Sequence, residues 1–149
     1  MPTAGKLTAA FLFAALFGAV AQLALPAFAA AEQPEPRAFA LVNMALGLVI
    51  GWRLGGARAG SNTWAGAVGQ GITTTVAITF AALVLHGGIR MVALSMRKAY
   101  DGPAEAVIAV FGLMIDIGRT AALPEVIAAL AAGAVVIGLV VEWIGRRAD

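Results

Sequence analysis

The sequence predicts an all-α, polytopic membrane protein with four transmembrane helices plus an amphipathic interfacial or re-entrant helix. Hydrophobic residues make up 61% of the 149-residue chain, and charged residues make up only 12%. Soluble domains carry roughly 25% charged residues, about twice this fraction. Four apolar stretches are each close to the roughly 20 residues that a helix needs to cross a bilayer. The length suits one unit, so we expect a single membrane domain over residues 1–149.

The composition also excludes several kinds of chemistry. The chain has no cysteine and one histidine, which rules out disulfides, thiolate metal sites and thiol redox reactions. One imidazole cannot hold a metal ion alone. The net charge of +2 comes from scattered basic residues, which is not the clustered pattern of nucleic-acid-binding proteins. We therefore expect no catalytic residue, no metal, no cofactor and no nucleic-acid partner.

The first predicted span covers residues 7–31, which carry no charge. It is similar to a secretory signal peptide, because small residues at 26–30 offer a cleavage site before Glu32. The apolar core of such signals is usually about 7–15 residues long, and this one is longer. We therefore expect an uncleaved anchor, followed by an external turn at residues 32–37 that contains two prolines.

The second predicted span covers residues 38–56 and carries glycine at every fourth position, at Gly47, Gly51 and Gly55. Small residues at this spacing let a second helix approach closely in a membrane. Two interpretations follow. The glycine face either packs against another helix of the same chain or forms a seam with a partner or a second copy.

The third and fourth predicted spans cover residues 64–89 and 123–145. Threonines in the third can hydrogen-bond to their own helix, whereas Gln22, Asn43 and Thr79 fall at a similar depth and can form a polar cluster between helices. That cluster is either structural or part of a solute pathway. In the fourth span, Pro124 and Glu125 favour a helix start, and Glu142 and Arg146 are spaced to form an ion pair.

Residues 86–119 hold seven of the 18 charged residues of the chain and its one histidine. At helical spacing these charges fall on one stripe in each half, and Pro103 with Glu105 predicts a helix start after a tight turn. In the resulting hairpin, Arg97 would face Glu105, and His86 and Arg90 would lie near Asp116. The charged hairpin comprises His86, Arg90, Arg97, Glu105, Asp116 and Arg119.

A second interpretation of this stretch is a pair of interfacial helices whose charges are solvated and bind nothing. The segment 103–118 could also cross as a fifth span, but it is short and includes two carboxylates, so we expect an interfacial or re-entrant position. With four spans, lysines and arginines are equally divided between the two sides of the membrane. Most acidic residues lie on the side opposite the termini, so we expect both termini in the cytoplasm.

Two short motifs carry a resemblance to a known family. The segments VNMALGLVIGW (residues 42–52) and MRKAYDGPAEAV (residues 96–107), in this order in a four-span chain, resemble the TrgA-like family of small alphaproteobacterial membrane proteins associated with tellurite resistance. The resemblance implies a bacterial inner-membrane location and a link to oxyanion tolerance. It supplies no catalytic residue.

These observations predict a non-enzymatic accessory or assembly protein of the inner membrane, as a homo-oligomer or as a subunit of a larger membrane complex. In this interpretation the glycine face docks and the charged hairpin is presented to a partner. The alternative is an oligomeric channel or transporter for a small anion, built on Arg90 with Gln22 and Asn43. Direct tellurite reduction by this chain is implausible because it has no thiol.

Overall fold

The computed structural model describes residues 3–33, 38–97, 100 and 102–148, and every regular element in this part of the chain is a helix. This confirms the all-α fold class. The helices are α1 (Ala4–Ala30), α2 (Phe39–Ile50), the π-helix η1 (Gly51–Gly55), α3 (Trp64–Ser95), α4 (Pro103–Ala121) and α5 (Pro124–Ala148). Of the external turn predicted at 32–37, residues 34–37 lie outside the described part.

Three helices are long and apolar enough to cross a membrane, namely α1, α3 and α5. The second predicted span is shorter than expected, because α2 has 12 residues and η1 adds five. Together they fall below the roughly 20 residues of a typical span. By contrast, α3 has 32 residues and is roughly 48 Å long, so it exceeds a hydrocarbon core of about 30 Å. The third span and the first half of the predicted hairpin are therefore one continuous helix.

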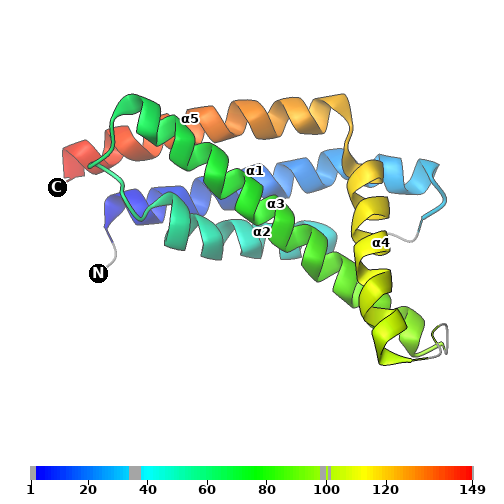
Figure 1. Ribbon diagram of the computed structural model, residues 1–149. Coiled ribbons are helices and arrows are strands. Elements are labelled where there is room, and N and C mark those ends of the chain that lie inside the picture. Colours follow the sequence, from blue (N-terminus) through cyan, green and yellow to red (C-terminus); the bar gives the residue numbers. More distant parts are fainter. Residues whose placement is uncertain (1–2, 34–37, 98–99, 101, 149) are drawn as a thin grey trace.

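Helix α1 lies at the centre of the bundle, with α2 and α5 alongside it (Figure 1). It contributes to both hydrophobic cores, through Phe13 and Phe17 in one and through Phe28 in the other. Phe13 and Phe28 are each only 1% exposed. Both ends of the chain lie at the same end of the bundle (Figure 1).

The glycine face of the second predicted span packs against α1 of the same chain. A methyl group on Gly47 would lie 2.5 Å from the Phe13 carbonyl oxygen, and one on Gly51 would lie 2.8 Å from that of Ala9. At Gly55 the neighbour would be the Phe13 ring, at 2.7 Å. Real side chains cannot come this close, so the backbones pack directly. Of the two sequence interpretations, the structure corresponds to packing within one subunit, and α1 occupies the face expected to dock a partner.

The π-helix η1 interrupts what the sequence predicts as one regular helix. Its wider turn is closed by the Gly56 amide, which donates to the Gly51 carbonyl oxygen over 2.9 Å. Such single π-turns insert an extra residue into a helix and disturb its regular bonding. The carbonyl of Leu54 in this turn accepts a hydrogen bond of 2.7 Å from Gln70 Nε2 on α3. A side chain from a neighbouring helix thus stabilises the irregular segment.

Helices α3 and α5 also meet backbone to backbone. A methyl group on Gly71 would overlap the Ala134 carbonyl oxygen, and one on Gly138 would overlap that of Ala67. Gly138 and Ala134 therefore lie on the face of α5 that packs against α3. Gly71 is the complementary position on α3, and the sequence analysis did not single it out.

Helix α4 begins as the sequence predicts, with Gly102 as the N-cap, Pro103 in the first turn and Glu105 close behind it. Asp101, part of the predicted turn, lies outside the described residues. The helix runs back along α3, where Gly87 packs against Met114. In Figure 1, α4 runs across the direction of α1 and α5 rather than alongside them. By length and composition, α4 is not among the helices that could cross a membrane, and its interfacial position stays a prediction.

Replacing Gly71 by alanine should destabilise the bundle by about 1–3 kcal/mol, the usual cost of overpacking a close contact. The new methyl group has backbone on the opposite side, so α3 and α5 must separate. Gly69→Ala is the matched control, because nothing lies within 4 Å of a Cβ at that position and alanine favours a helix over glycine. Thermal unfolding of the detergent-solubilised variants measures the difference. Equal stabilities would contradict direct backbone packing between these helices.

Candidate functional site

A cavity of about 230 Å³ lies where all five α-helices meet. Its walls are mostly apolar and include Phe17 from α1, Leu83 from α3, Ile117 from α4 and Leu130 from α5. Three polar side chains line it as well: Asn43, Thr79 and His86. Ligand sites are commonly concave, mainly apolar and equipped with a few polar groups. This cavity is the candidate site of the molecule.

The polar pair in the cavity joins α2 to α3. Asn43 Nδ2 donates to the Phe39 carbonyl oxygen over 2.7 Å and lies 3.2 Å from His86 Nε2. Both side chains are buried, with 5% and 3% of their surface exposed. The His86 ring also stacks obliquely on Phe39, with 4.8 Å between ring centroids. The imidazole is therefore held in one orientation by an amide on one edge and an aromatic ring against one face.

The predicted polar cluster is only partly assembled. Asn43 and Thr79 line the same cavity, and the Thr79 hydroxyl donates to the Thr75 carbonyl oxygen in its own helix, as predicted for threonines of this span. Gln22 is exposed and is not among the cavity-lining residues. His86 is the partner of Asn43, a contact that the sequence did not predict. The available signal was that Asn43 and His86 are both close to the ends of their predicted spans that lie on the same side of the membrane.

The predicted charged hairpin takes a different form. Arg90 Nη1 donates to Gln33 Oε1 at the end of α1, over 3.3 Å. Neither His86 nor Arg90 pairs with Asp116 in the described part of the chain, so this part of the prediction is wrong. The reason is the rotation of α4, which buries Ile117 and Ala106 and leaves Asp116 exposed. Arg97, Glu105 and Arg119 are exposed too, and the facing of Arg97 and Glu105 stays a prediction.

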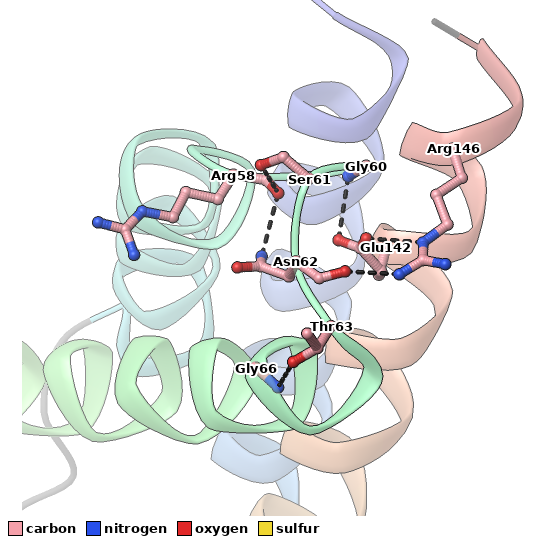
Figure 2. A network of polar contacts seen from close by, with 8 residues as sticks. All are labelled: Arg58, Gly60, Ser61, Asn62, Thr63, Gly66, Glu142 and Arg146. Atoms are coloured by element: carbon pink, nitrogen blue, oxygen red, sulfur yellow. Dashed lines mark hydrogen bonds and ion pairs between the residues drawn. The ribbon is translucent and has the colours of Figure 1, made fainter.

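At the opposite end of the bundle a buried carboxylate holds a loop against α5 (Figure 2). Glu142, only 1% exposed, accepts a hydrogen bond of 3.0 Å from the Gly60 amide and pairs with Arg146 Nε at 2.8 Å. Arg146 also donates to the Asn62 carbonyl oxygen over 2.5 Å. We call Gly60, Asn62, Glu142 and Arg146 the loop clamp. It stabilises the connection between η1 and α3.

The sequence predicts the Glu142–Arg146 pair from its spacing, and the structure confirms it. The role of the loop could not be predicted, because the contact partners lie 82 and 84 positions apart. Gly60 has a φ of 85°, a conformation that glycine adopts without strain. This turn brings its amide onto Glu142. A side chain at Gly145 would also clash with the backbone of Gly60.

No family model, no curated protein and no solved structure matches this chain. Within the described residues, no group of three or more histidine, aspartate or glutamate side chains is placed to hold a metal ion. The cavity, the loop clamp and helix α4 are therefore the features of the chain from which a function can be inferred.

Replacing Glu142 by glutamine should loosen the loop clamp, because an amide oxygen can accept from Gly60 or Arg146 but carries no charge. We expect a loss of about 1–3 kcal/mol in unfolding free energy, less than for a fully buried pair since the Arg146 side chain is 40% exposed. Limited trypsin digestion should cut faster after Arg58, which lies in the released loop.

Glu125→Gln is the matched control, since it makes the same change at an exposed position in the first turn of α5. The free energy of unfolding should fall only by the roughly 0.3–1 kcal/mol that a charge at a helix end contributes. Cleavage after Arg58 should not change. Equal digestion of the Glu142→Gln variant and the unmodified protein would mean that the loop is held without this carboxylate.

Proposed function

We propose that this chain is a non-enzymatic, four-span accessory or assembly subunit of the bacterial inner membrane, which presents α4 to a partner membrane protein. The observation that carries the proposal is the exposed apolar stripe of α4. Its four large side chains are each more than half exposed, on a helix that is otherwise packed against α3: Val107, Ile108, Phe111 and Ile115.

The charges of α4 support an interfacial position for this stripe. At about 100° per residue, Glu105, Asp116 and Arg119 fall together on one side of the helix, next to the apolar stripe and away from the buried face. A helix at the membrane surface can then keep its charges in water while the apolar stripe remains at the level of the lipid. A partner helix that crosses the bilayer beside α4 would cover the stripe.

The resemblance of residues 42–52 and 96–107 to the TrgA-like family supports the inner-membrane location and a link to tellurite tolerance. In this proposal the effect on tellurite is indirect, through the partner, because the chain carries no thiol that could reduce the oxyanion. The anion-channel alternative has less support. Among the described residues, Arg90 is bonded to Gln33, and Gln22 lies outside the apolar cavity that Asn43 lines.

A photo-crosslinking amino acid in place of Phe111 should give a discrete adduct with a second, different polypeptide in intact membranes. Val136 on α5, which is 57% exposed against 64% for Phe111, is the matched control and should react with lipid only. Adducts with lipid alone at both positions would mean that α4 faces the bilayer. An adduct only with a second copy of the chain would contradict the accessory role and favour the homo-oligomeric alternative.

Deleting the gene should lower the tellurite concentration that stops growth, and Phe111→Ser should fail to restore it, because a polar side chain weakens apolar contact with the partner. Val136→Ser should restore growth fully. The inhibitory concentration is compared at equal membrane levels of the two variants. Full restoration by Phe111→Ser would separate tellurite tolerance from the exposed face of α4.

A further inference from the structure

The cavity between the five helices is equipped to bind a small molecule. Its volume of about 230 Å³ exceeds the roughly 150 Å³ of an apolar protein cavity that takes up benzene. Ile127, one of the lining residues, is 56% exposed. The cavity therefore reaches the outer surface of the bundle near the start of α5, where a lipid-soluble molecule could enter.

The hydrogen bonds of Asn43 fix which atoms of the polar pair are donors. The Phe39 carbonyl oxygen can only accept, so the atom 2.7 Å away must be the amide nitrogen of Asn43. The same nitrogen lies 3.2 Å from His86 Nε2, which must therefore accept. A neutral imidazole that accepts at Nε2 carries its proton on Nδ1.

This arrangement leaves two groups with unused capacity, the Nδ1–H donor of His86 and the Oδ1 acceptor of Asn43. Neither atom has a hydrogen-bond partner among the described residues. In this part of the chain, every side-chain nitrogen or oxygen that is fully enclosed does have a hydrogen-bond partner. Both atoms must therefore touch open space, and both residues line the cavity. The site offers one donor and one acceptor on two side chains that are more than nine-tenths buried.

A hydroxyl group can satisfy the His86 donor, because its oxygen accepts a hydrogen bond. Asn43 lies at the opposite, Nε2 edge of the ring, so its Oδ1 needs a second donor. Apart from Thr79, whose hydroxyl donates to its own helix, the remaining walls are apolar and carry no charged side chain, so an ion would lose its hydration without compensation. We propose that the cavity binds a neutral, lipid-soluble molecule of one or two rings with a phenolic hydroxyl, whose oxygen receives a hydrogen bond from His86 Nδ1. This site is independent of the exposed face of α4.

The test uses the fact that His86 is the only histidine of the chain. Protein labelled with ¹⁵N-histidine, purified in detergent with a tag that contains no histidine, gives a single set of imidazole signals. Without ligand, the nitrogen shifts should report a neutral ring protonated on Nδ1. Addition of 1-naphthol should move the Nδ1–H signal saturably, with an apparent affinity about tenfold or more above that of naphthalene, which has the same rings without the hydroxyl.

Two glycines of α4 provide a matched pair of variants. Gly118 lines the cavity, and a Cβ there meets only the Leu83 side chain, at 3.7 Å or more, whereas Gly112 has nothing within 4 Å. Gly118→Leu should fill the cavity and abolish the response to 1-naphthol, and Gly112→Leu should retain it. The comparison of 1-naphthol with naphthalene on the unmodified protein holds even if Gly118→Leu does not fold.

Three results would overturn the proposal. The first is a ring that is charged or protonated on Nε2. The second is a response to 1-naphthol that does not saturate or that naphthalene matches, which indicates partition into the detergent. The third is an equal response in the folded Gly118→Leu and Gly112→Leu variants, which places the probe outside the cavity.

Discussion

Direct backbone contact between helices is the constraint on which the rest of this structure depends. In a membrane, apolar side chains gain little by leaving lipid for protein, so helices associate where small residues allow close approach. Here α1 lies against Gly47 and Gly51 of the second predicted span, while Gly71 and Gly138 join α3 to α5. These contacts position the larger side chains, such as Phe13 and Phe28, in the gaps that remain. The cavity lies at one end, where the helices diverge toward α4.

Apart from Thr74 and Thr75, whose hydroxyls bond to their own helix, the buried polar and charged side chains lie at the two ends of the bundle. They differ in how completely they are bonded. At the end that holds both termini, Glu142 has a partner for each oxygen, and the loop clamp is closed. At the α4 end, Asn43 and His86 bond each other and retain one donor and one acceptor. A buried polar group without a partner costs free energy. The first arrangement serves stability, whereas the second is the kind that a bound molecule completes.

The sequence predicts the helices well because their signals are local. Pro103 and Glu105 begin α4, Pro124 and Glu125 begin α5, and the Glu142–Arg146 pair follows from spacing alone. Three helices with the length and apolarity of membrane spans are confirmed, whereas the second predicted span is shorter than expected. Continuity of α3 to Ser95 was not predicted, since the charges after His86 suggested a new element.

The contacts between helices could not be predicted in the same way, because they depend on how each helix is rotated. Gly51 looks the same in sequence whether α1 or a partner covers it. A rotation of α4 by one residue exchanges Asp116 for Ile117 on its buried face, which is why the expected pairing with Arg90 is absent. His86 and Asn43 are 43 positions apart, and only the packing of α2 against α3 brings them together.

The π-helix η1 changes how the residues that follow it are rotated about the helix axis. Each residue of an α-helix turns the backbone by about 100°, so one extra residue in a wide turn rotates everything that follows by that amount relative to a regular helix. Gly55 lies against Phe13, and the loop that follows lies against α5, where the Gly60 amide donates to Glu142. The short loop then reaches Glu142 without a longer connection. A local irregularity of five residues thus sets the direction from which α3 enters the bundle.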